Sequence, residues 1–77
     1  MNKELKSEIN IIINYFNVGN YNKVLELCKK ILKYSPENDF ILNIVGLSYQ
    51  KISQLDNAEN FFIRAINVNK NNINALT

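Results

Sequence analysis

Several residue types are scarce in this chain of 77 residues, and each absence excludes a class of protein. The sequence contains no His and no Trp, one Cys, one Pro and two Gly. A single Cys cannot form an intramolecular disulfide, which excludes a cysteine-rich secreted framework. So few Gly and Pro residues leave little material for the tight turns of an all-β fold. Without His, neither a Cys–His catalytic pair nor a His-containing metal site is possible.

The overall composition is typical of one small globular domain. Hydrophobic residues make up 47% of the chain and charged residues 21%, which is too apolar for a disordered segment. The formal net charge of +2 is too small to attract a polyanion. Lys29, Lys30 and Lys33 cluster, but Glu26 lies one turn earlier and aromatic residues do not interleave with them. We interpret them as a solvated face and expect no nucleic-acid partner.

The N-terminal region carries no signal for export or for membrane insertion. Its charges are mixed, and Asn10 and Asn14 interrupt the apolar stretch at residues 9–16. A signal peptide needs an unbroken apolar region, and a spanning helix needs about 20 apolar residues. The lone Cys28 suits a reducing compartment. We therefore predict a soluble, cytoplasmic protein with no membrane partner.

The chain matches itself when it is shifted by 34 residues. Tyr15 aligns with Tyr49, and the other aligned positions keep their chemical type. The remaining pairs are Asn22 with Asp56, Val24 with Ala58, Leu27 with Phe61, Cys28 with Phe62, Ile31 with Ala65, Leu32 with Ile66 and Asn38 with Asn72. Because both the apolar stripes and the breaks coincide, the sequence indicates two copies of one structural unit.

Apolar residues recur at three- and four-residue spacing within both units, which predicts amphipathic helices. These helices are expected at about 3–18, 22–34, 40–53 and 56–68. Gly19-Asn20, Tyr34-Ser35-Pro36 and Ser53-Gln54 provide the breaks between them. The helices that follow are expected to be capped by Asn22, by Asn38 or Asp39, and by Asp56. Such short connections imply antiparallel helix pairs.

The second unit resembles the tetratricopeptide repeat (TPR) family, whose unit of about 34 residues reads W-x-x-L-G-x-x-Y, then A-x-x-x-F-x-x-A, then P. The matching residues are Leu42, Val45, Gly46 and Tyr49, followed by Ala58, Phe62 and Ala65, with Lys70 where Pro is usual. We expect Gly46 and Ala58 to let two helices approach closely, because neither has a long side chain. Phe62 and Tyr49 are expected to fill the space beside that contact.

The first unit resembles the same family with two departures. Its matching residues are Tyr15, Val24, Cys28, Ile31 and Pro36, and Gly19-Asn20-Tyr21 stands where the family often has Gly-Asp-Tyr. Glu8 replaces the large aromatic residue of the motif, and Ile12 replaces its small Gly. We expect Ile12 to push its two helices apart or to rotate them.

The resemblance implies an all-α fold, in which antiparallel helix-turn-helix repeats stack as a short right-handed superhelix, an α-solenoid. The first repeat would span 5–38 and the second 39–72, and 73–77 would begin a truncated third. Stable stacks usually need about three or more repeats. We therefore expect either a piece of a longer protein or a homo-oligomer in which another chain covers the fourth helix. The residues left uncovered would be Phe61, Ile63, Ile66 and Val68.

The resemblance also implies a peptide-binding groove, which the first helix of each repeat would line. The lining residues would be Lys6, Ile9, Ile13, Phe16 and Asn17 from the first unit, and Phe40, Asn43, Ile44, Leu47, Gln50 and Lys51 from the second. Some family members grip a peptide carboxylate with Lys and Asn, but Ile9 and Ile13 occupy those places here. This apolar face suits an amphipathic helix or another repeat. Alternatively, Ile9, Ile13 and Phe16 pack on a preceding or symmetry-related helix.

We predict a non-catalytic scaffold or adaptor that binds a protein or peptide and uses no cofactor and no metal. Cys28 is interpreted as a core residue because it aligns with Phe62. Two alternatives remain open. One is a structural protein that forms a homodimer through its open repeat ends. The other is the N-terminal repeat region of a larger enzyme, such as a transferase, in which the repeats help to place the substrate.

Overall fold

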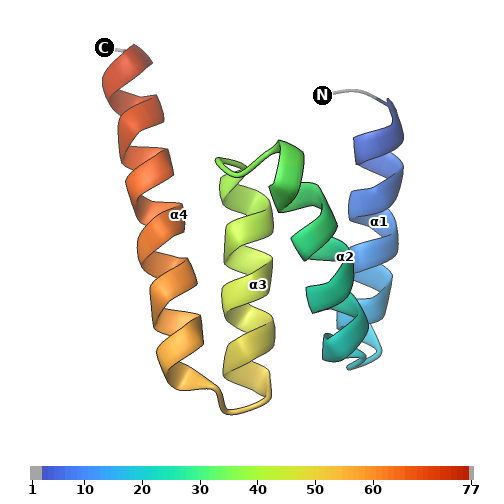
Figure 1. Ribbon diagram of the computed structural model, residues 1–77. Helices are drawn as coiled ribbons and strands as arrows, with labels where there is room; N and C mark the ends of the chain where they lie inside the picture. The colour runs from blue at the N-terminus through green and yellow to red at the C-terminus, as the bar shows by residue number, and fades with distance from the viewer. Residues whose placement is uncertain (1–2, 77) are drawn as a thin grey trace.

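The computed structural model describes residues 3–76, with side chains from residue 6 to residue 68, and it is all-α. The helices are α1 (Lys3–Asn17), α2 (Tyr21–Tyr34), α3 (Asp39–Lys51) and α4 (Leu55–Leu76). They lie side by side in chain order, with α1 and α4 at opposite ends of the row and neighbours antiparallel (Figure 1). The predicted all-α class is confirmed.

The α1–α2 connection is a Schellman turn, in which two backbone bonds close the end of α1. The Asn20 N–H donates to the Tyr15 carbonyl at 2.9 Å, and the Gly19 N–H donates to the Phe16 carbonyl at 3.0 Å. Gly19 adopts φ +81°, a left-handed conformation that Gly tolerates because it has no Cβ. The predicted break at Gly19-Asn20 is therefore confirmed.

The α3–α4 connection repeats this turn 34 residues later. The Gln54 N–H donates to the Tyr49 carbonyl at 2.9 Å, and the Ser53 N–H donates to the Gln50 carbonyl at 3.1 Å. Ser53 stands where the first turn has Gly, and it adopts φ 65°. The two units thus share their turn geometry as well as their apolar pattern, but the second turn strains a residue that has a side chain.

Two of the predicted helix caps are wrong, because the last residue of each Schellman turn, Asn20 or Gln54, directly precedes the next helix. The N-cap of α2 is Asn20 rather than Asn22, and its side-chain oxygen accepts a bond from the Lys23 N–H at 3.3 Å. Asp56 does not cap α4, because the helix already begins at Leu55. Asp56 instead lies in the first turn, where a carboxylate interacts favourably with the helix dipole.

The middle connection follows the prediction. Asn38 caps α3, and its side-chain oxygen accepts a bond from the Ile41 N–H at 3.1 Å. The second helix ends at Tyr34, directly before Ser35 and Pro36. The Ser35 N–H still donates to the Ile31 carbonyl at 2.8 Å, which closes the last turn before Pro36 stops the helix.

The predicted end of the fourth helix at residue 68 is wrong, because α4 continues to Leu76. The stretch 69–76 contains neither Gly nor Pro, and Lys70 stands where a Pro would stop the helix. The helix therefore runs without a break through residue 73, where the third repeat was expected to begin. The side chains of 69–77 and the side chain of Leu5 lie outside the described residues, and the repeat boundaries stay predictions.

The core lies along the interfaces between consecutive helices. Its main cluster consists of Ile12, Val24, Leu25, Cys28, Ile31, Ile41, Ile44 and Val45. Helices α3 and α4 approach closely at Gly46, where an added Cβ would lie 2.6 Å from the Phe62 ring. Ala58 and Ala65 on α4 are also buried. The expectation that small residues allow this close approach is confirmed.

The first unit places its large and small interface residues on the opposite helices. Ile12 occupies the position of Gly46, and Cys28 occupies the position of Phe62. Both side chains are fully buried in the main cluster. Helices α1 and α2 also pack less extensively than α3 and α4. The effect expected of Ile12 on the separation or rotation of its helices stays a prediction.

Candidate functional site

The residues predicted to line a groove form one face on α1 and one on α3. On α3, Phe40, Asn43, Gln50 and Lys51 are exposed and Leu47 is half-buried. Their three- and four-residue spacing places them on one side of the helix. Ile44 lies away from this face, in the core, with only 9% of its surface exposed. The α3 face therefore has an apolar centre, Phe40 and Leu47, within a polar border.

The corresponding α1 residues are more involved in packing. Lys6 and Asn17 are exposed, whereas Ile9, Ile13 and Phe16 are half-buried. Ile9 and Phe16 pack against the main core cluster. The Phe16 ring also meets the Tyr21 ring edge-on, with 5.4 Å between ring centroids. We call the two sets together, without Ile44, the α1–α3 face.

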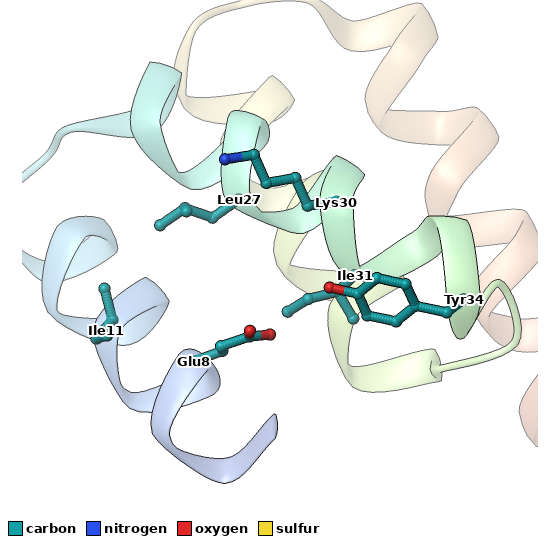
Figure 2. Close-up of a pocket in the computed structure, with 6 residues that line it drawn as sticks. All are labelled: Glu8, Ile11, Leu27, Lys30, Ile31 and Tyr34. Carbon is teal, nitrogen blue, oxygen red and sulfur yellow. The ribbon is translucent and has the colours of Figure 1, made fainter. Parts of the chain in front are cut away.

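A separate hollow of about 180 Å³ lies between α1 and α2. It is lined by Glu8 and Ile11 from α1 and by Leu27, Lys30, Ile31 and Tyr34 from α2 (Figure 2). It contains none of the residues predicted for the groove. Figure 2 shows the Glu8 carboxylate directed across the hollow toward α2. The hollow therefore combines aliphatic and aromatic walls with two charged side chains, Glu8 and Lys30.

The repeat explains why this hollow exists. Glu8 aligns with Leu42, which is completely buried in the second unit. Leu27 aligns with Phe61, so the first unit also has the smaller residue at that position. The departure at Glu8 was recognised from the sequence, but the hollow it creates was not predicted. The signal was available, because Glu8 is acidic where its counterpart is buried, and an exposed acidic side chain does not fill the volume that Leu42 fills.

Cys28 is a buried thiol, as the sequence predicted. Its side chain is fully buried between α2 and its neighbours. Burial raises the pKa of the Cys28 thiol to about 12, because the thiolate would lose its hydration. A thiol that stays neutral and inaccessible is a poor nucleophile.

The remaining charges are arranged as an ordinary solvated surface. Lys23 and Glu26 form an exposed ion pair at 2.9 Å on α2. The hydrogen bond between these two side chains lowers the pKa of Glu26 and raises the pKa of Lys23. Within the part of the chain that the structure describes, no group of three or more acidic or Cys side chains could hold a metal ion. None of the described helices combines the length and apolar character needed to cross a membrane.

Comparisons with protein-family models, with curated proteins and with solved structures find no match for this chain. The resemblance to the TPR family therefore remains a prediction that rests on the chain's own residues. The internal repeat is independent of any such match, because it is read from the sequence and from the two equivalent turns.

Proposed function

We propose that this protein is a non-catalytic interaction module of the TPR kind, which binds a protein or peptide segment on the α1–α3 face. The observation that carries the proposal is the apolar centre of the α3 part of this face. Phe40 is 42% exposed and Leu47 is half-buried, beside the exposed polar residues Asn43 and Gln50. An accessible aromatic anchor within a polar rim is typical of a peptide-binding surface.

The repeated turn supports a stacked arrangement of like units. Both units close their first helix with the same pair of backbone bonds, one repeat apart. Equivalent turns orient equivalent helices, so α1 and α3 would present equivalent faces to one ligand. A bound segment would then contact Ile13 and Phe16 on α1 as well as Phe40 and Leu47 on α3.

The chemistry of the ligand follows from the composition of the face. Aliphatic and aromatic side chains at its centre favour an amphipathic helix or an extended apolar segment. Lys51 and Lys6 at its border favour acidic residues on the flanks of that segment. The absence of a Lys–Asn pair at Ile9 and Ile13 argues against a ligand held mainly by its terminal carboxylate.

Selection from a random peptide display library against the full chain, followed by anisotropy titrations of selected peptides, tests this proposal. Phe40→Asp should weaken binding at least about tenfold, because it removes an exposed apolar anchor. The fold should survive, since Phe40 lies in the first turn of α3 and an acidic residue there is favourable.

Val18→Asp is the matched control. Val18 is 78% exposed and lies just beyond α1, outside the α1–α3 face. Its replacement should leave binding of the same peptides unchanged. If Phe40→Asp and Val18→Asp have equal effects, or if the library yields no peptide, the proposed function is contradicted.

A further inference from the structure

A second surface lies on α4, at the end of the row of helices (Figure 1). Leu55 and Ile66 are each 63% exposed and Ile63 is 48% exposed. Glu59 is also exposed and lies between them at helical spacing, so all four share one side of α4. We call these four residues the α4 stripe. Three large aliphatic side chains this accessible on one helix side form an apolar patch.

The first unit shows what normally covers this side. The counterparts of Glu59 and Ile66 on α2 are Leu25 and Leu32. Leu25 is only 8% exposed, and Leu32 packs against the same cluster, which includes residues of α3. The cluster includes Ile41, Ile44 and Val45, so α3 covers on α2 the part that corresponds to Glu59 and Ile66. The counterparts of Leu55 and Ile63 differ, since Tyr21 packs edge-on against Phe16 of α1 and Lys29 is exposed. For Glu59 and Ile66, the internal repeat points to an antiparallel helix as the occupant.

The opposite end of the row is mainly polar, with Ile11 as its one strongly exposed aliphatic residue within α1 as described, at 49%. This polar character argues against head-to-tail stacking of identical chains. Three residues of α3 that are buried have exposed polar counterparts on α1. The α3 residues are Ile41, Ile44 and Ser48, and their counterparts are Ser7, Asn10 and Asn14. An α1 helix of another copy would place these polar groups on Leu55, Ile63 and Ile66, where they would lose hydration.

Glu59 argues against face-to-face pairing of two α4 stripes. A two-fold interface would bring two Glu59 carboxylates into one apolar contact, where like charges repel. Arg64 on the same helix does not lie beside the stripe, because its guanidinium sits over the Phe61 ring at 4.8 Å from the centroid. A partner that supplies its own cation would complement Glu59.

We propose that the α4 stripe docks an amphipathic helix of a different protein, which carries an aliphatic stripe like that of α3 and a Lys or Arg opposite Glu59. The position of that cation follows from the antiparallel packing of α2 and α3. The short connection between Tyr34 and Asp39 places Leu25 level with Ser48. Since Leu25 is the counterpart of Glu59, the cation belongs at the position that Ser48 holds in α3.

A labelled synthetic peptide with the sequence of residues 38–54 and the change Ser48→Lys is the probe. The matched probe carries Ser48→Glu instead. Both are titrated against the full chain by fluorescence anisotropy. The Lys peptide should bind at least about tenfold more tightly than the Glu peptide, and Glu59→Gln in the chain should reduce that preference at least about fivefold.

Variants of the chain locate the peptide. Ile66→Asp should weaken binding of the Lys peptide at least about tenfold and should not disturb the fold, since Ile66 is largely exposed. Phe40→Asp should leave this binding unchanged, which separates the α4 stripe from the α1–α3 face. The proposed function and this proposal can therefore fail independently.

Three results would overturn the proposal. Equal affinity for the Lys and Glu peptides would remove the role of Glu59. Binding that survives Ile66→Asp would show that the peptide binds outside the α4 stripe. Sedimentation equilibrium that shows a dimer of the full chain, lost in Ile66→Asp, would make another copy of this chain the occupant.

Discussion

The two units of this protein fill equivalent positions with opposite distributions of volume. In the second unit, Gly46 on α3 accepts the ring of Phe62 from α4. In the first unit, the large residue is Ile12 on α1 and the small one is Cys28 on α2, and both are buried. A packed interface fixes the combined volume of the two facing side chains. The large residue can therefore lie on either helix, provided that the residue facing it is small.

The largest expected effect on stability comes from placing the large residues of both units at one helix interface. Gly46→Ile places a branched side chain against the Phe62 ring and should lower the free energy of unfolding by about 3 kcal/mol. The double variant Gly46→Ile with Phe62→Cys copies the first unit and should recover at least half of that loss. Urea denaturation of wild type, both single variants and the double variant measures the coupling. Simple additivity of the two changes would refute the exchange of volume.

A smaller gain is expected from making the first unit more like the second. Glu8→Leu places at the hollow of Figure 2 the residue that the second unit buries at that position, Leu42. The added apolar burial should raise the free energy of unfolding by about 2 kcal/mol. Glu8→Gln is the control, because it removes the charge without filling the volume. An equal gain from Glu8→Gln would show that charge, and not unfilled volume, distinguishes the units.

The two turns predict a third effect. Ser53→Gly should stabilise the protein by about 1 kcal/mol, because it relieves the left-handed conformation at φ 65°. Gly19→Ser should cost a similar amount at the equivalent position of the first turn. Thermal unfolding followed by circular dichroism compares the pair. Effects of the same sign would mean that the two turns are not equivalent.

The smallest effect concerns Cys28, whose counterpart Phe62 does not titrate. The pKa of the thiol is about 12 in the folded protein against 9.0 in the absence of burial. The folded state therefore holds its proton where the unfolded chain releases it, so the stabilisation is complete below pH 9.0 and is lost as the pH rises toward 12. The stability advantage of wild type over Cys28→Ala should shrink by less than about 1 kcal/mol between about pH 7 and about pH 9.5. A constant difference would place the thiol in contact with water.

Local signals in the sequence predicted the fold class and the number of helices. Apolar spacing identified every helix, and Pro36 and Gly19 marked two of the ends. The errors came from effects that depend on neighbouring structure. The cap at Asn20 and the start of α4 at Leu55 depend on how tightly each Schellman turn closes, which residue type alone does not determine. The end of α4 was misplaced because residues 69–76 supply no stop signal, so the spacing of the family motif was a poor guide.

The candidate site was harder to predict than the fold. Helical spacing correctly grouped the residues of each face, but it could not separate Ile44, which is buried, from Leu47, which remains accessible. That distinction depends on where α2 packs across α3, a contact between distant parts of the chain. The exposure of Leu55 was missed for the same reason.

The measurement that tests the account most directly is a map of backbone amide NMR shifts on binding a library-selected peptide. The account predicts that the shifted amides cluster on α1 and α3, around Phe16, Phe40 and Leu47, and that Phe40→Asp abolishes them. Shifts that cluster instead on α2, or that survive Phe40→Asp, would contradict the assignment of the α1–α3 face as the binding surface.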